Sequence, residues 1–188
     1  MPNLFEPEII EKAKLGDEQA FRVLVESFQG FVYSIAFRFT REEAEAEDLV
    51  QECFIRLWKN LNRYNPECKM KSWLGKMITN LCLDFIKSAR QKNALDKIDM
   101  KEKLNIADSA TVENELNATE LHSIVLKLTE QLTPKQRTAF ILRDLEMLEV
   151  SEVCEMLGIT AANLKSNLYY ARQSIKDSLL KYYKTPAL

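Results

Sequence analysis

Near the C-terminus, polar and charged side chains recur on one face of a predicted helix, with a chemistry that suits nucleic acid. They are donors, acceptors and cations that can bond phosphates and base edges: Asn163, Lys165, Ser166, Tyr169, Arg172 and Gln173. Lys165 and Arg172 are seven residues apart, so both can reach one groove from the same helix face. A solvated helix in an ordinary bundle would carry the same residue types, so this face alone leaves both interpretations open.

The elements that position this face read as a helix-turn-helix over residues 151–172. Ser151 is expected to cap a first helix, and Gly158 to end it in the left-handed conformation that glycine adopts easily. Thr160 can then cap the second helix, whose apolar positions form one buried stripe: Leu164, Leu168, Ala171, Ile175 and Leu179. Such a motif inserts its second helix into a DNA major groove.

The remainder of the chain also predicts helices, because helical periodicity recurs and no stretch shows sustained strand alternation. Expected helices cover residues 7–15, 17–39, 40–61, 71–92, 112–132 and 134–145. Thr40-x-x-Glu43 reads as a capping box for the third of these helices, and Thr133–Pro134 as the start of the last.

We therefore expect an all-α fold with two small helical domains, each with its own core, joined by a flexible linker. The first domain is predicted over residues 1–92, the linker over 93–111 and the second domain, with the helix-turn-helix, over 112–188. Charges dominate the predicted linker and strong periodicity lapses there.

Charge is segregated along the chain, although the net charge is only −2. Residues 41–53 hold one cation and six acids, a balance of −5, whereas residues 55–92 hold nine cations and two acids, a balance of +7. The basic block also contains Tyr64, Trp73 and Phe85, and cations beside aromatic rings are what single-stranded or unstacked nucleic acid binds. Either charge run could instead be a solvated face.

Nothing in the sequence assembles a catalytic or metal site. The four cysteines lack C-x-x-C spacing, the single histidine, His122, is distant from them, and no glycine-rich phosphate loop occurs. Cys53, Cys82 and Cys154 lie among apolar helical positions and are expected in the core, whereas Cys68 lies in a polar loop. We expect a binding protein that is not an enzyme and uses no metal or cofactor. Since no apolar run could span a bilayer and no signal peptide begins the chain, we expect a cytoplasmic protein with no membrane insertion.

Three motifs, in this order, resemble the sigma-70 family, and the chain is similar to its extracytoplasmic function (ECF) group. The D-L-V-Q-E-x-F pattern of the family's polymerase-binding helix runs from Asp48 to Phe54. The following W-L…I-x-N-x-x-x-D pattern is present as Trp73, Leu74, Ile78, Asn80 and Asp84. The stretch LTPKQR, from Leu132 to Arg137, and the first hairpin helix resemble the family's second domain.

The resemblance implies a sigma factor that directs core RNA polymerase to specific promoters in response to a signal. Its first domain would correspond to sigma region 2 and would dock on the β′ clamp helices through Asp48, Leu49, Gln51, Glu52 and Leu57. The same domain would bind the proximal promoter element, capturing a flipped base in the 62–70 loop with Asn80. The implied proximal contacts are Arg63, Tyr64, Lys69, Lys71, Trp73, Asn80, Lys87 and Arg90, although Trp73 could equally be buried core.

The second domain would correspond to sigma region 4 and would read the distal promoter element in duplex form. Its implied contacts are Asn163, Lys165, Ser166, Asn167, Tyr169 and Arg172. Asn167 and Tyr170 stand where the family often has cations, so promoter binding without polymerase should be weak. The β subunit of polymerase and an anti-sigma factor are further expected partners. The alternatives are a sigma-like decoy that binds an anti-sigma protein, and a stand-alone helix-turn-helix regulator.

Overall fold

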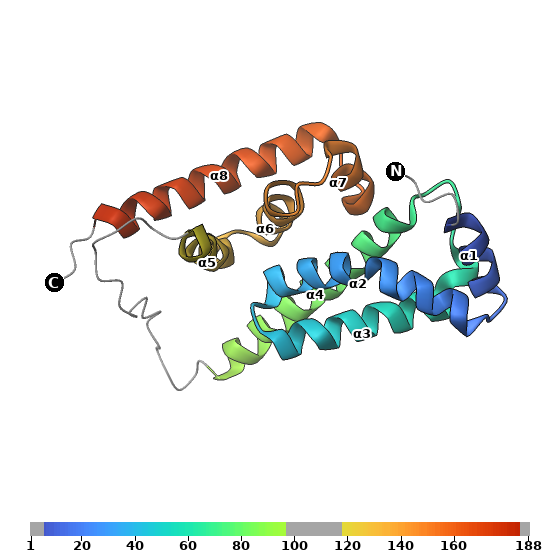
Figure 1. Ribbon diagram of the computed structural model, residues 1–188. Helices are drawn as coiled ribbons and strands as arrows, with labels where there is room; N and C mark the ends of the chain where they lie inside the picture. Colours follow the sequence, from blue (N-terminus) through green and yellow to red (C-terminus); the bar gives the residue numbers. More distant parts are fainter. Residues whose placement is uncertain (1–5, 97–117, 185–188) are drawn as a thin grey trace.

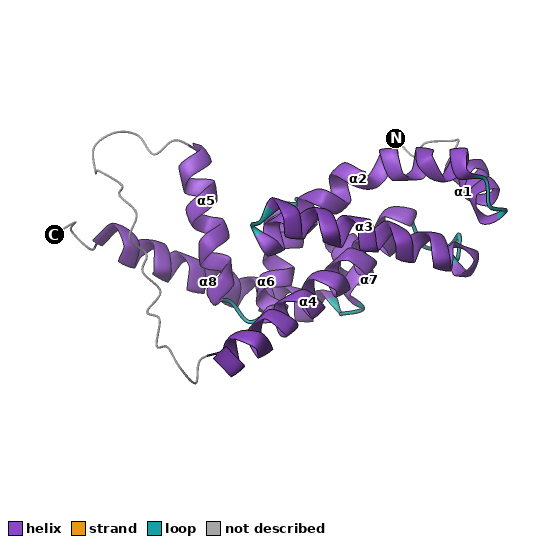
Figure 2. Ribbon diagram, turned by 90° about the horizontal axis from the view of Figure 1, so that it is seen from below, coloured by secondary structure: helices purple, strands orange, loops and turns teal. Residues whose placement is uncertain are grey.

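The computed structural model describes residues 6–96 and 118–184, and every regular element in these two ranges is helical (Figures 1 and 2). The first range contains α1 (Glu6–Lys14), α2 (Glu18–Thr40), α3 (Glu43–Asn60), the short 3-10 turn η1 (Leu61–Arg63) and α4 (Met70–Asp96). The second contains α5 (Ala118–Leu128), η2 (Thr129–Gln131), α6 (Pro134–Phe140), the π-helical turn η3 (Ile141–Leu145), α7 (Val150–Leu157) and α8 (Ala161–Lys184). The all-α prediction is confirmed.

The helix-turn-helix forms through the local signals that its sequence carries. Gly158 has φ 63° and ends α7 in the left-handed conformation, and the Thr160 hydroxyl accepts a hydrogen bond from the Asn163 backbone N–H at 3.2 Å. The apolar stripe of α8 is buried at Leu164, Leu168, Ala171 and Ile175 and half-buried at Leu179. Thr133 also caps α6 as predicted, in a capping box with Gln136.

Two other predicted caps are wrong, because a neighbouring residue takes the position. α2 continues through Thr40, Arg41 adopts φ 61° at its end, and Glu42 is the N-cap of α3, so Thr40 forms no capping box with Glu43. α7 begins at Val150 with Glu149 as its N-cap, in a reciprocal capping box with Glu152. Ser151 consequently lies within the first turn of α7 rather than before it.

The predicted linker boundary also shifts, because α4 runs to Asp96 instead of ending near Lys92. The rest of the predicted linker, 97–111, and the start of the following predicted helix, 112–117, lie outside the described residues. The division of the chain into two domains remains a prediction.

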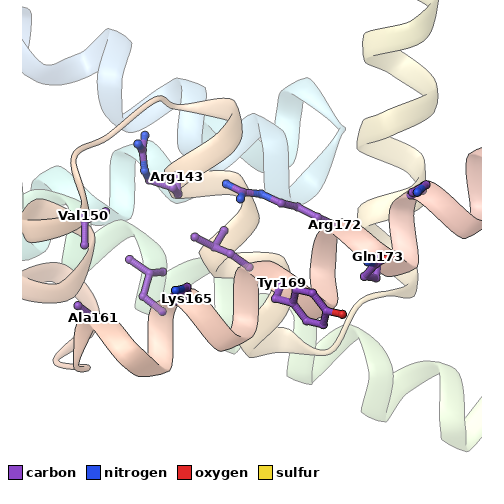
Figure 3. Close-up of a pocket in the computed structure, with 10 residues that line it drawn as sticks. Arg143, Val150, Ala161, Lys165, Tyr169, Arg172 and Gln173 are labelled. Atoms are coloured by element: carbon purple, nitrogen blue, oxygen red, sulfur yellow. The ribbon is translucent and has the colours of Figure 1, made fainter.

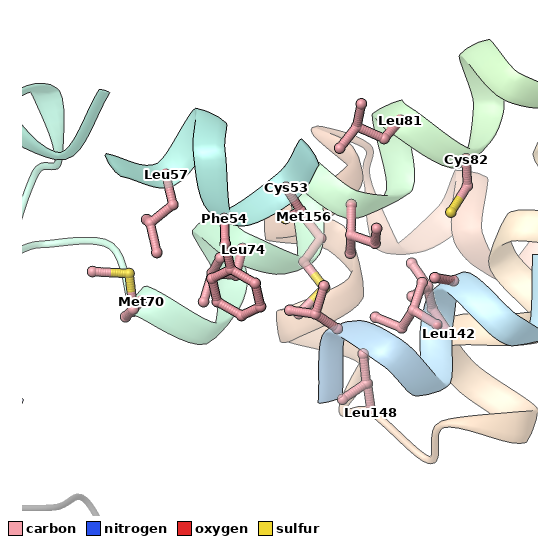
Figure 4. Close-up of a cluster of buried hydrophobic side chains, with 14 of the residues drawn as sticks. Cys53, Phe54, Leu57, Met70, Leu74, Leu81, Cys82, Leu142, Leu148 and Met156 are labelled. Carbon is pink, nitrogen blue, oxygen red and sulfur yellow. The ribbon is translucent and has the colours of Figure 1, made fainter. Parts of the chain in front are cut away.

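The prediction of two separate cores is only partly right. A small cluster belongs to the second domain alone: Leu128, Leu132, Phe140, Ala171 and Ile175. The larger cluster is continuous across both domains, because it contains Leu142, Leu148 and Met156 of the second domain together with side chains of α2, α3 and α4 (Figure 4). Burial of this apolar surface helps to hold the two halves together.

Candidate polymerase and promoter interfaces

The acidic face of α3 is open to solvent at two of the positions predicted to contact polymerase. Asp48 and Gln51 are exposed and Leu49 is half-buried. Glu52 is half-buried and accepts a hydrogen bond from Arg56 Nε at 2.6 Å, one turn later on the same helix. Beside Gln51, between α2 and α3, lies a hollow of about 440 Å³ lined by Gln29, Gly30, Tyr33, Glu47, Val50 and Gln51. A partner helix could therefore reach both carboxylates and an adjoining recess.

Leu57 cannot be part of this docking face in the structure, because its side chain is 0% exposed and packs in the core. The exposed apolar side chains of α3 are instead Ile55, at 46%, and Trp58, at 40%. They follow Asp48 and Gln51 at helical spacing, so they extend the acidic face by one to two turns. This spacing was available in the sequence, but an apolar stripe does not say which of its members face a partner.

Tyr64 stabilises the loop between α3 and α4 through contacts with the loop and with neighbouring side chains. Tyr64 is 8% exposed, and its hydroxyl donates a hydrogen bond to the Cys68 carbonyl. Its ring lies 5.3 Å from the ring of half-buried Trp73, measured between centroids, and Lys14 Nζ lies 5.6 Å from the Tyr64 ring. Because Tyr64 is buried and already in contact with Trp73 and Lys14, its ring is not accessible for stacking on a base in this structure.

The other predicted proximal contacts lie on or beside α4. Lys69, Asn80 and Lys87 are exposed and fall near one helix face, which also carries exposed Lys76. Lys87 Nζ is 3.5 Å from Asp84 Oδ1. The remaining cations differ in placement: Arg63 is exposed in η1, Lys71 is half-buried with its Nζ 5.0 Å from the Phe31 ring, and the Arg90 side chain lies outside the described part.

At the distal surface, Asn163, Lys165, Ser166 and Tyr169 are all exposed on α8, opposite its buried stripe. Asn167 is half-buried and donates a hydrogen bond to the Asn163 carbonyl at 2.8 Å. A groove of about 620 Å³ runs beside them (Figure 3). Its walls combine apolar and cationic side chains: Arg143, Val150, Ala161, Leu164, Lys165, Leu168, Tyr169, Arg172, Gln173 and Lys176.

Arg172 is engaged within the domain. Its Nε and Nη2 donate to the two carboxylate oxygens of Asp144 at 2.8 and 2.7 Å, a bidentate pair that ties α8 to η3. The hydrogen bond that Arg172 donates to the Asp144 carboxylate raises the pKa of Arg172. Arg143 and Lys176, which sequence reasoning did not select, add positive charge to the same groove as Lys165. Arg143 belongs to this groove only because η3 packs beside α8, which the sequence alone does not indicate.

Polar contacts join the two halves of the chain at several points. Arg38 and Ser34 of α2 both bond Glu146, and Arg38 Nη1 lies 2.9 Å from His122 Nε2. Arg137 is buried and donates to the Phe39 carbonyl at 2.8 Å. Near the proximal loop, the Ser72 hydroxyl donates to Glu155 Oε2 at 2.7 Å.

The Glu155 contact also shapes the acid–base properties of this junction. The pKa of the Glu155 carboxyl is lowered, first by the hydrogen bond from Ser72 and next by one from the Cys68 thiol. The pKa of Cys68 is raised to about 11, chiefly by burial and then by its hydrogen bond to Glu155. Burial raises the pKa of Cys53 and of Cys82 to about 12, in keeping with their predicted place in the core.

Within residues 6–96 and 118–184, no group of three or more His, Cys, Asp or Glu side chains could hold a metal ion. Among the described helices, none is long and apolar enough to cross a membrane. What the described residues do combine is an acidic helix face, a basic helix face and a helix-turn-helix, the parts of an adaptor between a protein and DNA.

Comparisons with known proteins agree with this combination. Residues 24–92 match the family model described as Sigma-70 region 2, and residues 122–175 match Sigma-70, region 4. The chain is 28% identical over 176 residues to the ECF RNA polymerase sigma factor SigW of Bacillus subtilis, covering 90% of this chain and 94% of that protein. It is 25% identical over 182 residues to the ECF RNA polymerase sigma-E factor of Haemophilus influenzae, covering 94% and 96%.

Solved structures of similar fold include CnrH in complex with the cytosolic domain of CnrY, with TM-score 0.67 and 18% identity over 96% of this chain and 99% of that one. The sigma factor RpoE of Bartonella quintana, in complex with the anti-sigma factor NepR, has TM-score 0.62 and 19% identity over 85% and 96%. The chain belongs to the sigma-70 family and is an RNA polymerase sigma factor of the ECF group. Sigma factors are non-enzymatic initiation factors that bind core RNA polymerase and promoter DNA.

Proposed function

We propose that three surfaces of this sigma factor divide the work of promoter-specific initiation. The exposed face of α3 docks on the β′ clamp helices of core polymerase, the α4 face and its preceding loop bind the proximal promoter element, and α8 reads the distal element. The observation that carries this assignment is the exposure of Asp48 and Gln51 on α3 beside a separate cationic face of α4.

On α3, carboxylates and apolar side chains act together. Asp48 and Glu52 meet cations of the partner, while Ile55 and Trp58 supply the apolar contact in place of buried Leu57. Complementary charge sets the orientation and rate of docking, and desolvated apolar anchors add affinity. The ring of Trp58 packs edge-to-face on the ring of Phe21, with 4.7 Å between the centroids, and this contact restricts the position of Trp58.

On α4, Lys69 and Lys87 contact phosphates, and Asn80 with the loop selects a base that has left the stack. On α8, Lys165 reaches a base edge because it lies near the N-terminal end of the recognition helix. Arg172 acts by holding α8 in place through Asp144.

The protein is expected to work in the cytoplasm, where polymerase and promoter DNA are found. One structural neighbour, the sigma factor RpoE of Bartonella quintana, is bound to the anti-sigma factor NepR, and this likeness in fold motivates the proposal that an anti-sigma factor controls this chain. Such a factor would link initiation to a signal.

Transcription of a genomic library by core polymerase, with and without the protein, tests the proposal. Discrete new start sites are expected only when the protein is present. Operator binding with no new start sites would favour a stand-alone regulator. Capture of an anti-sigma protein with neither DNA binding nor initiation would favour a decoy.

A further inference from the structure

We propose that the hollow between α2 and α3 receives an arginine side chain of the β′ clamp helices, and that Gly30 keeps the hollow open for it. The proposal rests on the assignment of α3 to polymerase docking. It adds residues of α2 that no sequence motif selected, Gln29, Gly30 and Tyr33, and so extends the docking surface from one helix to two.

The hollow is built from one face of each helix. Its volume is about 440 Å³, and its lining comes from neighbouring positions of α2 and from positions at helical spacing on α3: Gln29, Gly30, Tyr33, Glu47, Val50 and Gln51. Gln51 is also one of the exposed residues of the acidic face of α3, so the hollow continues that face towards α2. A partner helix that lies on α3 would therefore pass its opening.

Nothing in the fold itself explains a glycine at position 30. Gly30 lies in the interior of α2, where glycine is less favourable than alanine, and it has no positive φ. A Cβ atom built there would meet no atom within 4 Å beyond its own stretch of helix, whereas one built on Gly75 would lie 2.6 Å from Met156 Sδ. Since neither a turn nor close packing excludes a side chain at Gly30, what its absence provides is space in the hollow.

The lining suits a long cation. Glu47 is exposed, and none of the ion pairs between described residues includes it. Val50 and Tyr33 are half-buried, and the Tyr33 ring is held by stacking on Phe37, with 6.0 Å between the ring centroids. Arginine combines an apolar stem with a planar guanidinium, so one side chain can lie on Val50, stack on Tyr33 and bond Glu47.

Two amide groups favour arginine over lysine as the occupant. Gln29 and Gln51 are exposed at the hollow, and each side-chain oxygen can accept a hydrogen bond. A guanidinium has five N–H donors in one plane, enough for a carboxylate and two amides, whereas an ammonium has three donors and no planar face to stack on Tyr33. An acidic partner side chain is disfavoured, because Glu47 and the adjacent exposed Asp48 would repel it.

Titration of core polymerase with the fluorescently labelled full-length chain tests whether the hollow is used. Gly30→Leu should weaken binding by about tenfold, because its side chain fills the space that the partner needs. Gly30→Ala adds only a methyl group and should stay within about twofold of the wild type. Both variants should melt at or above the wild-type temperature, since alanine and leucine favour a helix more than glycine does. The melting temperature thus separates a filled hollow from a damaged fold.

Gln19→Leu is the matched control for the added side chain. Gln19 is exposed on the same side of α2, about three turns before Gly30, and does not line the hollow. Its leucine variant should bind polymerase within about twofold of the wild type. Equal affinities for Gly30→Leu and Gln19→Leu would overturn the proposal.

A double-mutant cycle tests the occupant. Glu47→Gln should weaken polymerase binding at least about threefold and reduce its salt dependence, whereas Glu45→Gln, at an exposed position on another face of α3, should do neither. Each arginine of the β′ clamp helices is then replaced by lysine in turn. One replacement should weaken binding of the wild type but cause no further loss with Glu47→Gln. Additive losses for every arginine would show that the hollow does not take an arginine.

The double variant Asp48→Lys, Glu52→Lys separates this inference from the wider assignment of α3. If that variant loses polymerase while Gly30→Leu and Glu47→Gln bind normally, α3 docks without the hollow and only the present proposal fails. If all three variants bind polymerase like the wild type, the assignment of α3 to the interface fails as well.

Discussion

The two surfaces of this sigma factor that we propose to bind DNA are built in different ways. The distal surface lies on α8, within one helix-turn-helix, and four of its predicted DNA contacts are exposed: Asn163, Lys165, Ser166 and Tyr169. The proximal surface lies where the two domains meet, and Ser72 at its edge is buried under Glu155. The proposed contacts of the first surface are therefore accessible, whereas Ser72 at the edge of the second is covered by α7.

This difference between the two surfaces suggests that polymerase, besides binding the protein, changes how its domains pack. A partner that binds the exposed face of α3 and separates the domains would uncover the proximal surface and place both surfaces on one template. Weak individual contacts can then act together, because the second binding event becomes intramolecular. Asn167 and Tyr170, which stand on α8 where the family often has cations, are consistent with such sharing of affinity.

The largest effect is expected from substitutions that prevent the protein from binding polymerase, since both DNA surfaces would then have to act without it. The double variant Asp48→Lys, Glu52→Lys is expected to weaken co-purification with core polymerase at least about a hundredfold, since attraction becomes repulsion at the docking face. Transcription should then be lost, while the circular-dichroism spectrum and distal duplex binding stay unchanged. Glu26→Lys with Asp177→Lys makes the same charge change at exposed positions elsewhere and should not affect co-purification. Normal polymerase binding by the folded double variant would remove α3 from the interface.

Exchanging the proximal loop should change base preference at the proximal promoter element and leave it unchanged at the distal element. Replacing the exposed residues Asn62, Arg63, Asn65 and Glu67 with those of another sigma factor, while keeping buried Tyr64, should change base preference at the proximal element. A changed base typically costs about 1–3 kcal/mol, and the preference at the distal element should not move. Holoenzyme binding to two panels of promoter variants measures both. A shift at the distal element would reverse the assignment of the domains.

Local signals in the sequence predicted the distal surface much better than the proximal surface. Gly158, Thr160 and the stripe of α8 act within a few residues of one another, so periodicity and capping rules located them. Thr40 and Ser151 failed as caps because Glu42 and Glu149, close by in sequence, fill those positions instead. Competing caps of similar strength are not ranked by sequence alone.

Contacts between distant segments escaped prediction altogether. Leu57 and Ile55 lie two positions apart on one amphipathic helix, yet one is core and the other is exposed. That distinction depends on how α2 and α4 pack on α3. The bond between Ser72 and Glu155 joins residues 83 positions apart, and no local pattern could indicate it.

At the distal surface, Lys165 should matter more than the other exposed lysine of the groove. Lys165→Ala is expected to cost about 1–3 kcal/mol and to relax selectivity at one base pair, as a base-edge contact does. Lys176→Ala, three turns later on α8, should weaken binding uniformly across sequences and lower the salt slope by about one. Binding to distal-element variants at several salt concentrations measures both. The same uniform loss for both variants would mean that Lys165 contacts phosphate.

The smallest effect is expected at Arg172, where a structural and a DNA-binding role can be told apart. Its guanidinium is held by both oxygens of Asp144, with the Arg172 side chain 57% exposed and that of Asp144 20% exposed. If the pair positions α8, Arg172→Ala and Asp144→Ala should each weaken distal binding by about 0.2–1 kcal/mol, the range of exposed ion pairs.

The double variant should be no weaker than either single one, because both changes remove the same interaction, and the salt slope should stay unchanged. Direct phosphate contact by Arg172 gives a different pattern. Asp144→Ala would then free the guanidinium and leave binding unchanged or tighter, whereas Arg172→Ala would lower the salt slope by about 0.9. Thermal melting of each variant adds an independent reading, since only a positioning pair makes both single substitutions lower the melting temperature of the second domain by similar amounts.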